Sequence, residues 1–224
     1  MSTRLFLVRH GESVWNAEQR IQGQADPPLS ALGTQQACDL AETLSERPLV
    51  AVYCSPLVRA RETAAYICAP HHLAPCVEEG LREVNLGAWQ GYTPSDLSAE
   101  MRKLYHAWRL NPTTVHPPGG ETVDEARARA ARAVAAIAEE YRDATVVLVT
   151  HSILGRVLLC HCLGIGLYLV PRFKLKKASI SVIRLDEYGA VLERLGDTGH
   201  LRSSAPVEAP LDSGVRDAPV EVVP

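Results

Sequence analysis

The chain has 224 residues, of which 46% are hydrophobic, and a formal net charge of −3. This length and apolar content are sufficient for one large α/β domain with its own core. The charge is too small, and the basic cluster at 174–177 too short, for a nucleic-acid-binding surface. No signal-peptide pattern and no uncharged run long enough to span a bilayer is present. We therefore expect a cytoplasmic protein without nucleic-acid or membrane partners.

Six cysteines show neither the density of a disulfide scaffold nor a CxxC pair. Cys160-His161-Cys162 resembles a metal site only superficially, because adjacent and i,i+2 residues point to different sides of a helix. We therefore expect buried thiols here and no metal site.

The first third of the chain alternates short apolar runs with helical segments. Residues 5–8 predict a buried strand, and a polar loop follows over 11–29. A serine cap opens a predicted helix over 30–45. A second apolar run, 50–54, predicts another strand, after which Ser55-Pro56 is expected to open a helix, with serine as the cap.

The rest of the chain continues the alternation. Residues 74–93 predict a brief strand and a glycine-bearing loop, and 95–109 a helix. A capping box begins the long helix over 122–142. The apolar run 146–150 is the next strand, with Ser152 as the expected cap of the helix that follows.

The C-terminal part predicts a hairpin and then a tail. Residues 179–185 alternate as a strand, and 191–195 return after a glycine turn. The segment 203–224 lacks a periodic apolar face and is predicted to be a disordered tail. There is no internal repeat and no long linker, so residues 1–202 are predicted to form a single α/β domain.

Two histidines follow strand ends. His10 comes directly after the first apolar strand, beside Arg9, and His151 follows the strand over 146–150. Open parallel sheets carry their chemistry just beyond the carboxyl ends of strands. The two imidazoles are therefore expected to face one crevice.

Two such histidines could serve a metal, an acyl-transfer site or a phosphoryl-transfer site. The chain has no HExxH, no GxSxG elbow and no P-loop or dinucleotide glycine fingerprint. It has arginines instead, Arg9 beside His10 and Arg59 after the second strand, and guanidinium groups match phosphate oxygens bidentately. The pattern indicates an anion pocket in which one histidine is placed to attack.

Four segments resemble the histidine phosphatase superfamily, in its cofactor-dependent phosphoglycerate mutase-like branch. They are 7–16 (LVRHGESVWN), 55–60 (SPLVRA), Glu83 with 87–91 (GAWQG), and 149–151 (VTH). These matches lie in order between residue 4 and about residue 201. The resemblance implies a three-layer α/β/α sandwich with a mostly parallel central sheet.

The resemblance also implies roles for individual residues. His10 would be the nucleophile and become phosphohistidine, while Arg9, Arg59 and His151 would hold the phosphoryl group as three cationic groups. Glu83 would protonate the leaving alkoxide and then deprotonate the attacking water. No metal and no cofactor would be required.

On the substrate side the resemblance matches Asn16, Gln22, Gly23 and Arg109, and Gly11 is expected to leave room for the phosphate. The mutases carry an arginine pair where this chain has Arg109 alone, so water should outcompete a second substrate. The expected activity is phosphoric monoester hydrolysis of a small phosphorylated metabolite, for example a phosphorylated acid such as phosphoserine or 3-phosphoglycerate. A cofactor-dependent phosphoglycerate mutase and a non-catalytic phospho-ligand-binding relative remain alternatives, and a homodimer is expected by analogy.

Overall fold

A computed structural model describes residues 2–202 of the chain, so the predicted tail over 203–224 lies outside the described residues. The strands are β1 (Ser2–Arg9), β2 (Leu49–Cys54), β3 (Cys76–Val77), β4 (Thr145–Thr150), β5 (Ile180–Asp186) and β6 (Gly189–Asp197). The helices are α1 (Val14–Ala17), α2 (Ala31–Leu44), α3 (Val58–Cys68), α4 (Ala99–Leu110), α5 (Val123–Glu140) and α6 (Ser152–Cys162). Short 3₁₀ helices are η1 (Ala69–His71), η2 (Glu79–Leu81), η3 (Gly87–Trp89) and η4 (Leu167–Arg172).

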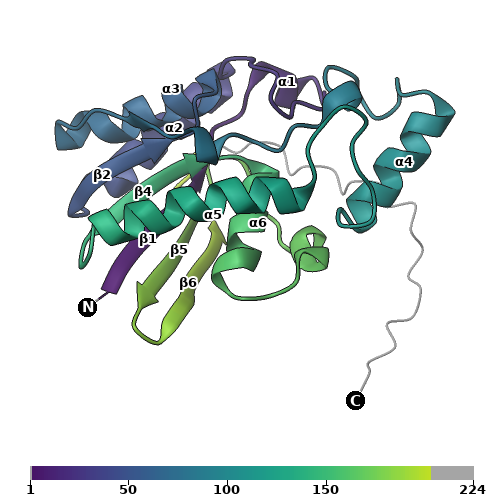
Figure 1. Cartoon of the computed structure of the whole chain (residues 1–224). Coiled ribbons are helices and arrows are strands. Elements are labelled where there is room, and N and C mark those ends of the chain that lie inside the picture. Colours follow the sequence, from purple (N-terminus) through teal and green to yellow (C-terminus); the bar gives the residue numbers. More distant parts are fainter. Residues whose placement is uncertain (1, 203–224) are drawn as a thin grey trace.

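The six strands form one mixed sheet in the order β3-β2-β4-β1-β5-β6. The pairs β1–β4, β2–β4 and β2–β3 are parallel, whereas β5 and β6 add an antiparallel hairpin beside β1. The sheet is therefore parallel where β1, β4 and β2 meet. This arrangement brings the carboxyl ends of β1 and β4 together at one edge (Figure 1).

Helices cover both faces of the sheet, with α2 and α3 on one side and α5 and α6 on the other (Figure 1). Alternate residues of β1 explain how one strand serves both layers. Leu5 and Leu7 pack in the core under α5 and α6, whereas Phe6 and Val8 pack in the core under α2 and α3. The expected three-layer α/β/α architecture is confirmed.

Two helix starts match the sequence prediction. Ser30 caps α2 by accepting the Gly33 amide at 3.1 Å. Thr122 and Glu125 form the capping box that begins α5. In both, a local side chain satisfies an amide group that the first helical turn leaves without a backbone partner.

The predicted start of α3 at Ser55-Pro56 is wrong. The helix begins at Val58, after Leu57, with no side-chain cap. The hydroxyl of Ser55 accepts the Leu57 amide at 3.3 Å and lies 2.7 Å from Nε2 of His151. The serine thus contacts a residue that directly follows β4, and the local sequence does not reveal this contact.

The predicted cap of α6 is wrong as well. His151 occupies the cap position, but its side chain makes no capping hydrogen bond to α6, and Ser152 is the first helical residue. The amides of Ile153 and Leu154 donate instead to the carboxylate of Glu83, from a distant loop. A negative charge at a helix N-terminus is favourable, so Glu83 replaces the expected serine cap.

The loop after β1 contains the short helix α1 and lies against α2. A Cβ added at Gly11 would lie 2.5 Å from the carbonyl oxygen of Gly33, so the two backbones touch there. Gly11 was expected to leave room for phosphate, but its lack of a side chain is explained by this packing against α2. Within residues 2–202, no helix combines the length and apolarity needed to cross a bilayer.

Candidate active site

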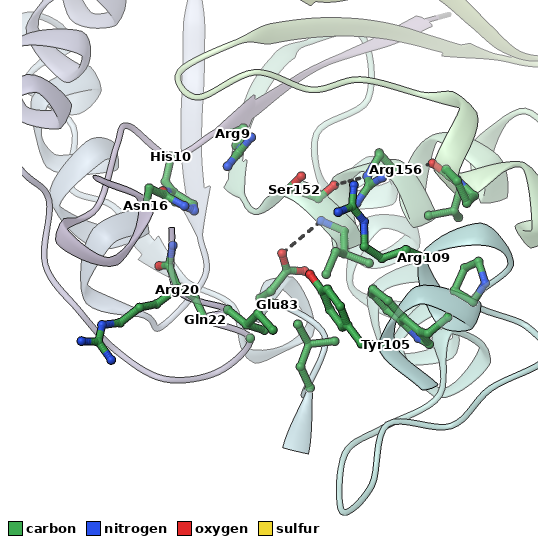
Figure 2. A pocket seen from close by; sticks show the side chains of 18 of the residues that line it. Arg9, His10, Asn16, Arg20, Gln22, Glu83, Tyr105, Arg109, Ser152 and Arg156 are labelled. Carbon is green, nitrogen blue, oxygen red and sulfur yellow. Dashed lines mark hydrogen bonds between the residues drawn. The ribbon is translucent and has the colours of Figure 1, made fainter. Parts of the chain in front are cut away.

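A pocket of about 310 Å³ opens at the edge where β1 and β4 end (Figure 2). Eight of the nine residues predicted for the site line it: Arg9, His10, Asn16, Gln22, Gly23, Arg59, Glu83 and Arg109. The ninth, His151, is fully buried beside His10, with ring centroids 5.0 Å apart. The structure therefore brings the predicted residues together.

His10 is buried and held in one orientation directly after β1. Its Nδ1 lies 2.6 Å from the carbonyl oxygen of Gly11, so this nitrogen carries the proton and donates it. Nε2 therefore keeps its lone pair, and Nε of Arg59 donates to it at 3.3 Å. The tautomer leaves Nε2 as the nucleophilic atom.

Charge and burial keep His10 neutral. Loss of water contact lowers the pKa of His10 well below its ordinary value, and the nearby cations Arg59 and Arg9 lower it further. The hydrogen bond to Gly11 acts in the opposite direction but is a smaller effect. At neutral pH the imidazole is therefore unprotonated, as a nucleophile must be.

His151 is also neutral, so it differs from the third cation that was expected. Burial lowers its pKa well below the ordinary value, and Arg59 and His10 add to the effect. The oxygen of Ser55 accepts the Leu57 amide, which leaves the Ser55 hydroxyl proton to be donated to Nε2 of His151. Nδ1 then carries the ring proton, and it has no hydrogen-bond partner among the described residues.

Arg59 connects the nucleophile to the neighbouring loop. Besides reaching His10, it donates to the carbonyls of Ala25 at 2.7 Å and Gly23 at 2.9 Å. Burial lowers its pKa to about 10, against the raising effect of the Glu83 carboxylate, so it remains a cation at neutral pH. Arg9 donates to the carbonyl of Leu175 at 2.7 Å.

Glu83 is buried and fixed by three amide groups. Its Oε1 accepts from Val84 at 2.9 Å and Leu154 at 2.8 Å, and its Oε2 accepts from Ile153 at 3.0 Å. Oε2 thus has one amide donor and keeps further lone-pair capacity, and Glu83 lines the pocket. The arrangement can hold a carboxyl group in a fixed place for proton transfer.

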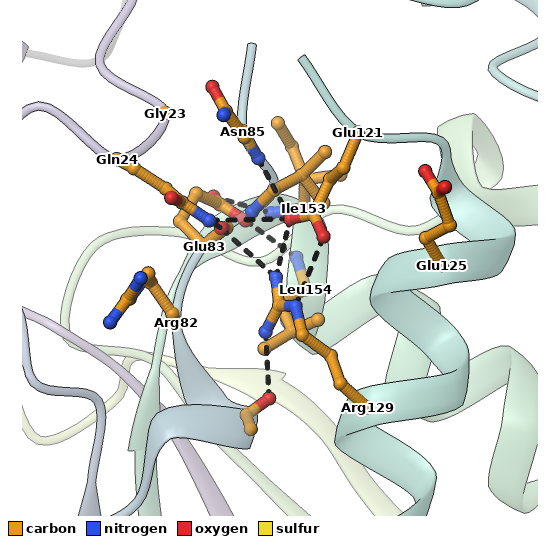
Figure 3. Close-up of polar contacts among 12 residues, drawn as sticks. Gly23, Gln24, Arg82, Glu83, Asn85, Glu121, Glu125, Arg129, Ile153 and Leu154 are labelled. Carbon is orange, nitrogen blue, oxygen red and sulfur yellow. Dashed lines mark hydrogen bonds and ion pairs between the residues drawn. The ribbon is translucent and has the colours of Figure 1, made fainter. Parts of the chain in front are cut away.

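A second set of contacts holds the backbone of Glu83 (Figure 3). Arg129 of α5 donates to the Glu83 carbonyl at 3.1 Å, and Gln24 donates to it at 3.0 Å. Glu121 pairs with Arg129 at 2.6 Å and accepts the Asn85 amide at 2.9 Å. Sequence reasoning missed Arg129, because it is one of several arginines on an alanine-rich helix.

The residues expected on the substrate side have structural partners too. Asn16 accepts the amide of Ser13 at 3.2 Å, and Gln22 accepts its hydroxyl at 2.8 Å. Gly23 has φ +53°, a conformation that favours glycine. Arg109 projects from the last turn of α4.

Sequence reasoning missed other pocket residues, namely Arg20, Tyr105, Trp108, Ser152 and Arg156. Arg156 had a usable signal. It is the single charged residue of α6, which is otherwise mostly apolar and buried. An arginine there needs polar surroundings, and it finds them in this pocket.

The chain matches known proteins over most of its length. The profile of the histidine phosphatase superfamily (branch 1) matches residues 5–198. Phosphoserine phosphatase 1 of Hydrogenobacter thermophilus is 34% identical over 198 residues, 88% of this chain and 94% of that protein. Metal-independent phosphoserine phosphatase of Arabidopsis thaliana is 35% identical over 205 residues, covering 90% and 84%.

A solved structure agrees with these sequence matches. A mycobacterial glucosyl-3-phosphoglycerate phosphatase, in complex with VO3, superposes with a TM-score of 0.81 at 32% identity, covering 87% of this chain and 99% of that one. Within residues 2–202, no three His, Cys, Asp or Glu side chains gather as a metal-binding group. The chain belongs to the histidine phosphatase superfamily.

Proposed function

We propose that the protein is a metal-independent phosphomonoesterase that acts on a small phosphorylated metabolite through a phosphohistidine at His10. The observation that carries the proposal is the neutral His10, whose Nε2 lone pair lies beside the buried cation Arg59. The pocket of about 310 Å³ is at the lower end of the range for small-molecule sites, which favours a metabolite over a protein loop. The names of the phosphatase relatives support the same reaction.

In the first half-reaction, Nε2 of His10 attacks phosphorus and the P–O ester bond breaks. The carboxylic acid of Glu83 gives its proton to the departing oxygen, so the alcohol leaves neutral. Arg9 and Arg59 neutralise the oxygens of the transferred group, and Nδ1–H of His151 donates to one of them. Positioned charges of this kind supply most of the catalysis in phosphoryl transfer.

In the second half-reaction, water attacks the phosphohistidine. The Glu83 carboxylate takes the proton from water, the P–N bond breaks, and inorganic phosphate leaves. His10 returns to its neutral tautomer, because the hydrogen bond to Gly11 keeps the proton on Nδ1. Glu83 ends protonated, ready for the next ester.

Phosphoglycerate mutase is the second candidate, and the names of other relatives at 34% identity include it. Arg109 stands alone at the position of the mutases' arginine pair, but α6 brings a second arginine, Arg156, to the same pocket. The count of arginines therefore no longer decides between the two activities. Incubation with 3-phosphoglycerate and a trace of its bisphosphate does decide, because a mutase accumulates 2-phosphoglycerate and a phosphatase accumulates inorganic phosphate.

The proposal is tested by phosphate release from p-nitrophenyl phosphate in EDTA. The wild type should release phosphate, and His10→Ala should lose at least about 10³-fold in kcat. Rapid quenching of the wild type should trap a protein-bound phosphate that is stable in alkali and labile in acid, absent from His10→Ala. No release by the wild type would favour the non-catalytic relative, and full activity in His10→Ala would exclude His10 as the nucleophile.

A cytoplasmic site of action is part of the proposal. It is supported by the six cysteines, which are all unpaired thiols, as is usual for proteins in a reducing compartment. Fractionation of the native cells, followed by immunodetection, tests it.

A further inference from the structure

Residues 175–179, between η4 and β5, form a backing segment for Arg9 and His10. The amide of Ala178 donates to the carbonyl of His10 at 3.1 Å, and the carbonyl of Ser179 accepts the amide of Arg9 at 3.1 Å. Both hydrogen bonds join main-chain groups, so they fix the backbone from which the two site side chains project. The position of the backing segment therefore bears on the position of the nucleophile.

The backing segment also contacts side chains near the start of the site loop. The carbonyl of Leu175 accepts from Nη1 of Arg9 at 2.7 Å, and Nζ of Lys177 pairs with Glu12 at 3.0 Å. The Lys177 and Glu12 side chains are both largely buried, so salt screens this ion pair little. A shift of the segment would therefore displace the Arg9 guanidinium as well as the backbone.

Ala178 has a backbone conformation that alanine rarely adopts. Its φ is +54°, in the left-handed region, where the Cβ of an L-residue lies too close to the backbone. Residues in this region persist only where the surrounding structure holds them, and they cluster at functional sites. Ala178 is fully buried, and the hydrogen bond from its amide to His10 is one such restraint.

His200 supplies a second restraint on Ala178. Its Nε2 lies 3.0 Å from the Ala178 carbonyl, and because a carbonyl only accepts, Nε2 carries the proton and donates it. Burial lowers the pKa of His200, so the ring is neutral at neutral pH and keeps its proton on this nitrogen. Two hydrogen bonds thus lead from His200 through one residue to the nucleophile.

The chain around His200 is anchored to the main body of the fold. Leu201 packs against the core under α2 and α3, and the amide of Arg202 donates to Asp39 of α2 at 3.2 Å. His200 itself does not line the catalytic pocket. It can therefore act on the reaction only through the residues that it holds.

We propose that His200 is a positioning residue, which holds the backing segment against Arg9 and His10 through the carbonyl of Ala178. The inference rests on the proposed phosphatase function. A displacement of reacting groups by about 1 Å can lower a rate on the order of 10²-fold, so a contact outside the pocket is sufficient to affect the reaction. The placement of Arg9 should suffer together with that of His10.

The test removes the hydrogen-bond donor and then restores it. His200→Phe keeps a ring without the N–H group, and it should lower kcat/KM about tenfold for every phosphate ester. His200→Gln can place an amide N–H near the position of Nε2, and it should stay within about threefold of the wild type. His161→Phe, at an exposed histidine of α6 outside the pocket, is the matched control and should leave kcat/KM unchanged.

Inhibition by orthovanadate separates positioning from stability. Vanadate takes the geometry of the transferred phosphoryl group, and its inhibition constant does not depend on how much of the enzyme is folded. With p-nitrophenyl phosphate in a buffer without chelator, His200→Phe should raise this constant about tenfold, in parallel with the loss in kcat/KM. His200→Ala, which also lacks the donor, takes its place if His200→Phe does not fold.

Three results would overturn the inference and leave the phosphatase proposal standing. They are an unchanged kcat/KM in the variant without the donor, a loss of kcat/KM with an unchanged vanadate constant, and an equal loss in His200→Gln. No phosphate release by the wild type would instead overturn the proposed function.

Discussion

The two ends of the pocket are built from different parts of the fold. The phosphoryl end consists of buried side chains that follow β1 and β4 or begin α3, namely His10, His151 and Arg59. The other end is formed by Arg109 and Arg156, which are more exposed and project from the helices α4 and α6. The side chains at the phosphoryl end are therefore placed by the sheet and the start of α3, whereas those at the other end are placed by helices outside the sheet.

After the loss of His10 itself, replacement of Arg59 should have the largest effect. Arg59→Gln removes the buried cation beside His10, and we expect kcat/KM to fall roughly 10²- to 10³-fold for every substrate. O-phosphoserine paired with O-phosphoethanolamine, and 3-phosphoglycerate paired with glycerol 3-phosphate, provide acids and their counterparts without the carboxylate for the measurement. The loss should be equal within each pair, since every ester carries the same phosphoryl group.

Arg59→Lys is the control for charge. It keeps the cation but loses the contacts to Gly23 and Ala25, and it should recover part of the activity. If either variant lost activity on the acids alone, the division of the pocket into two ends would be wrong.

A smaller effect is expected at Arg129, which positions Glu83 without lining this pocket. Arg129→Gln should lower kcat about tenfold for alkyl phosphates, because a displaced acid transfers its proton less well. The loss should be smaller for p-nitrophenyl phosphate, whose leaving group needs little protonation. Arg127→Gln on the same helix is the control, and equal losses on both kinds of ester would indicate a general structural defect.

The smallest effect concerns stability and involves the phosphoryl end alone. Burial lowers the folded-state pKa of His10 and His151, so below about pH 6.5 the unfolded chain binds protons that the folded chain does not. The free energy of unfolding should therefore fall as pH drops, by up to about 1.4 kcal/mol per pH unit for each histidine. Urea titrations at several pH values measure this slope.

His10→Gln should reduce that slope by up to about 1.4 kcal/mol per pH unit. His106→Gln, which replaces an exposed histidine of α4, controls for the loss of one imidazole. An unchanged slope in His10→Gln would mean that His10 takes up a proton in the folded protein as readily as in the unfolded chain.

Much of the fold and of the phosphoryl end was predictable from the sequence. Short apolar runs alternating with capped helices indicate the layered α/β architecture, and residues that follow parallel strands meet at one edge. His10, Arg9 and His151 directly follow or end such strands, so strand order alone brings them together. The position of Arg59 after the second strand also indicated the anion pocket, although its helix begins later than local rules predict.

The errors share a physical cause. Ser55 precedes α3 and Ser152 is the first residue of α6. Local preference favours both serines as caps, but long-range contacts with His151 and Glu83 determine those helix starts. Arg129 and Arg156 were missed for a related reason. Their roles depend on which face of α5 and of α6 packs toward Glu83 and the pocket. A pattern along the chain does not specify this orientation.

The contact between Gly11 and Gly33 limits how the enzyme can be redesigned. A side chain at either position would push the loop after β1 away from α2 and displace His10 with it. A mutant library aimed at new substrates should therefore leave this loop constant and diversify the last turn of α4, where Arg109 is exposed. Variants with new substrate specificity can then be selected while His10 keeps its position in the site.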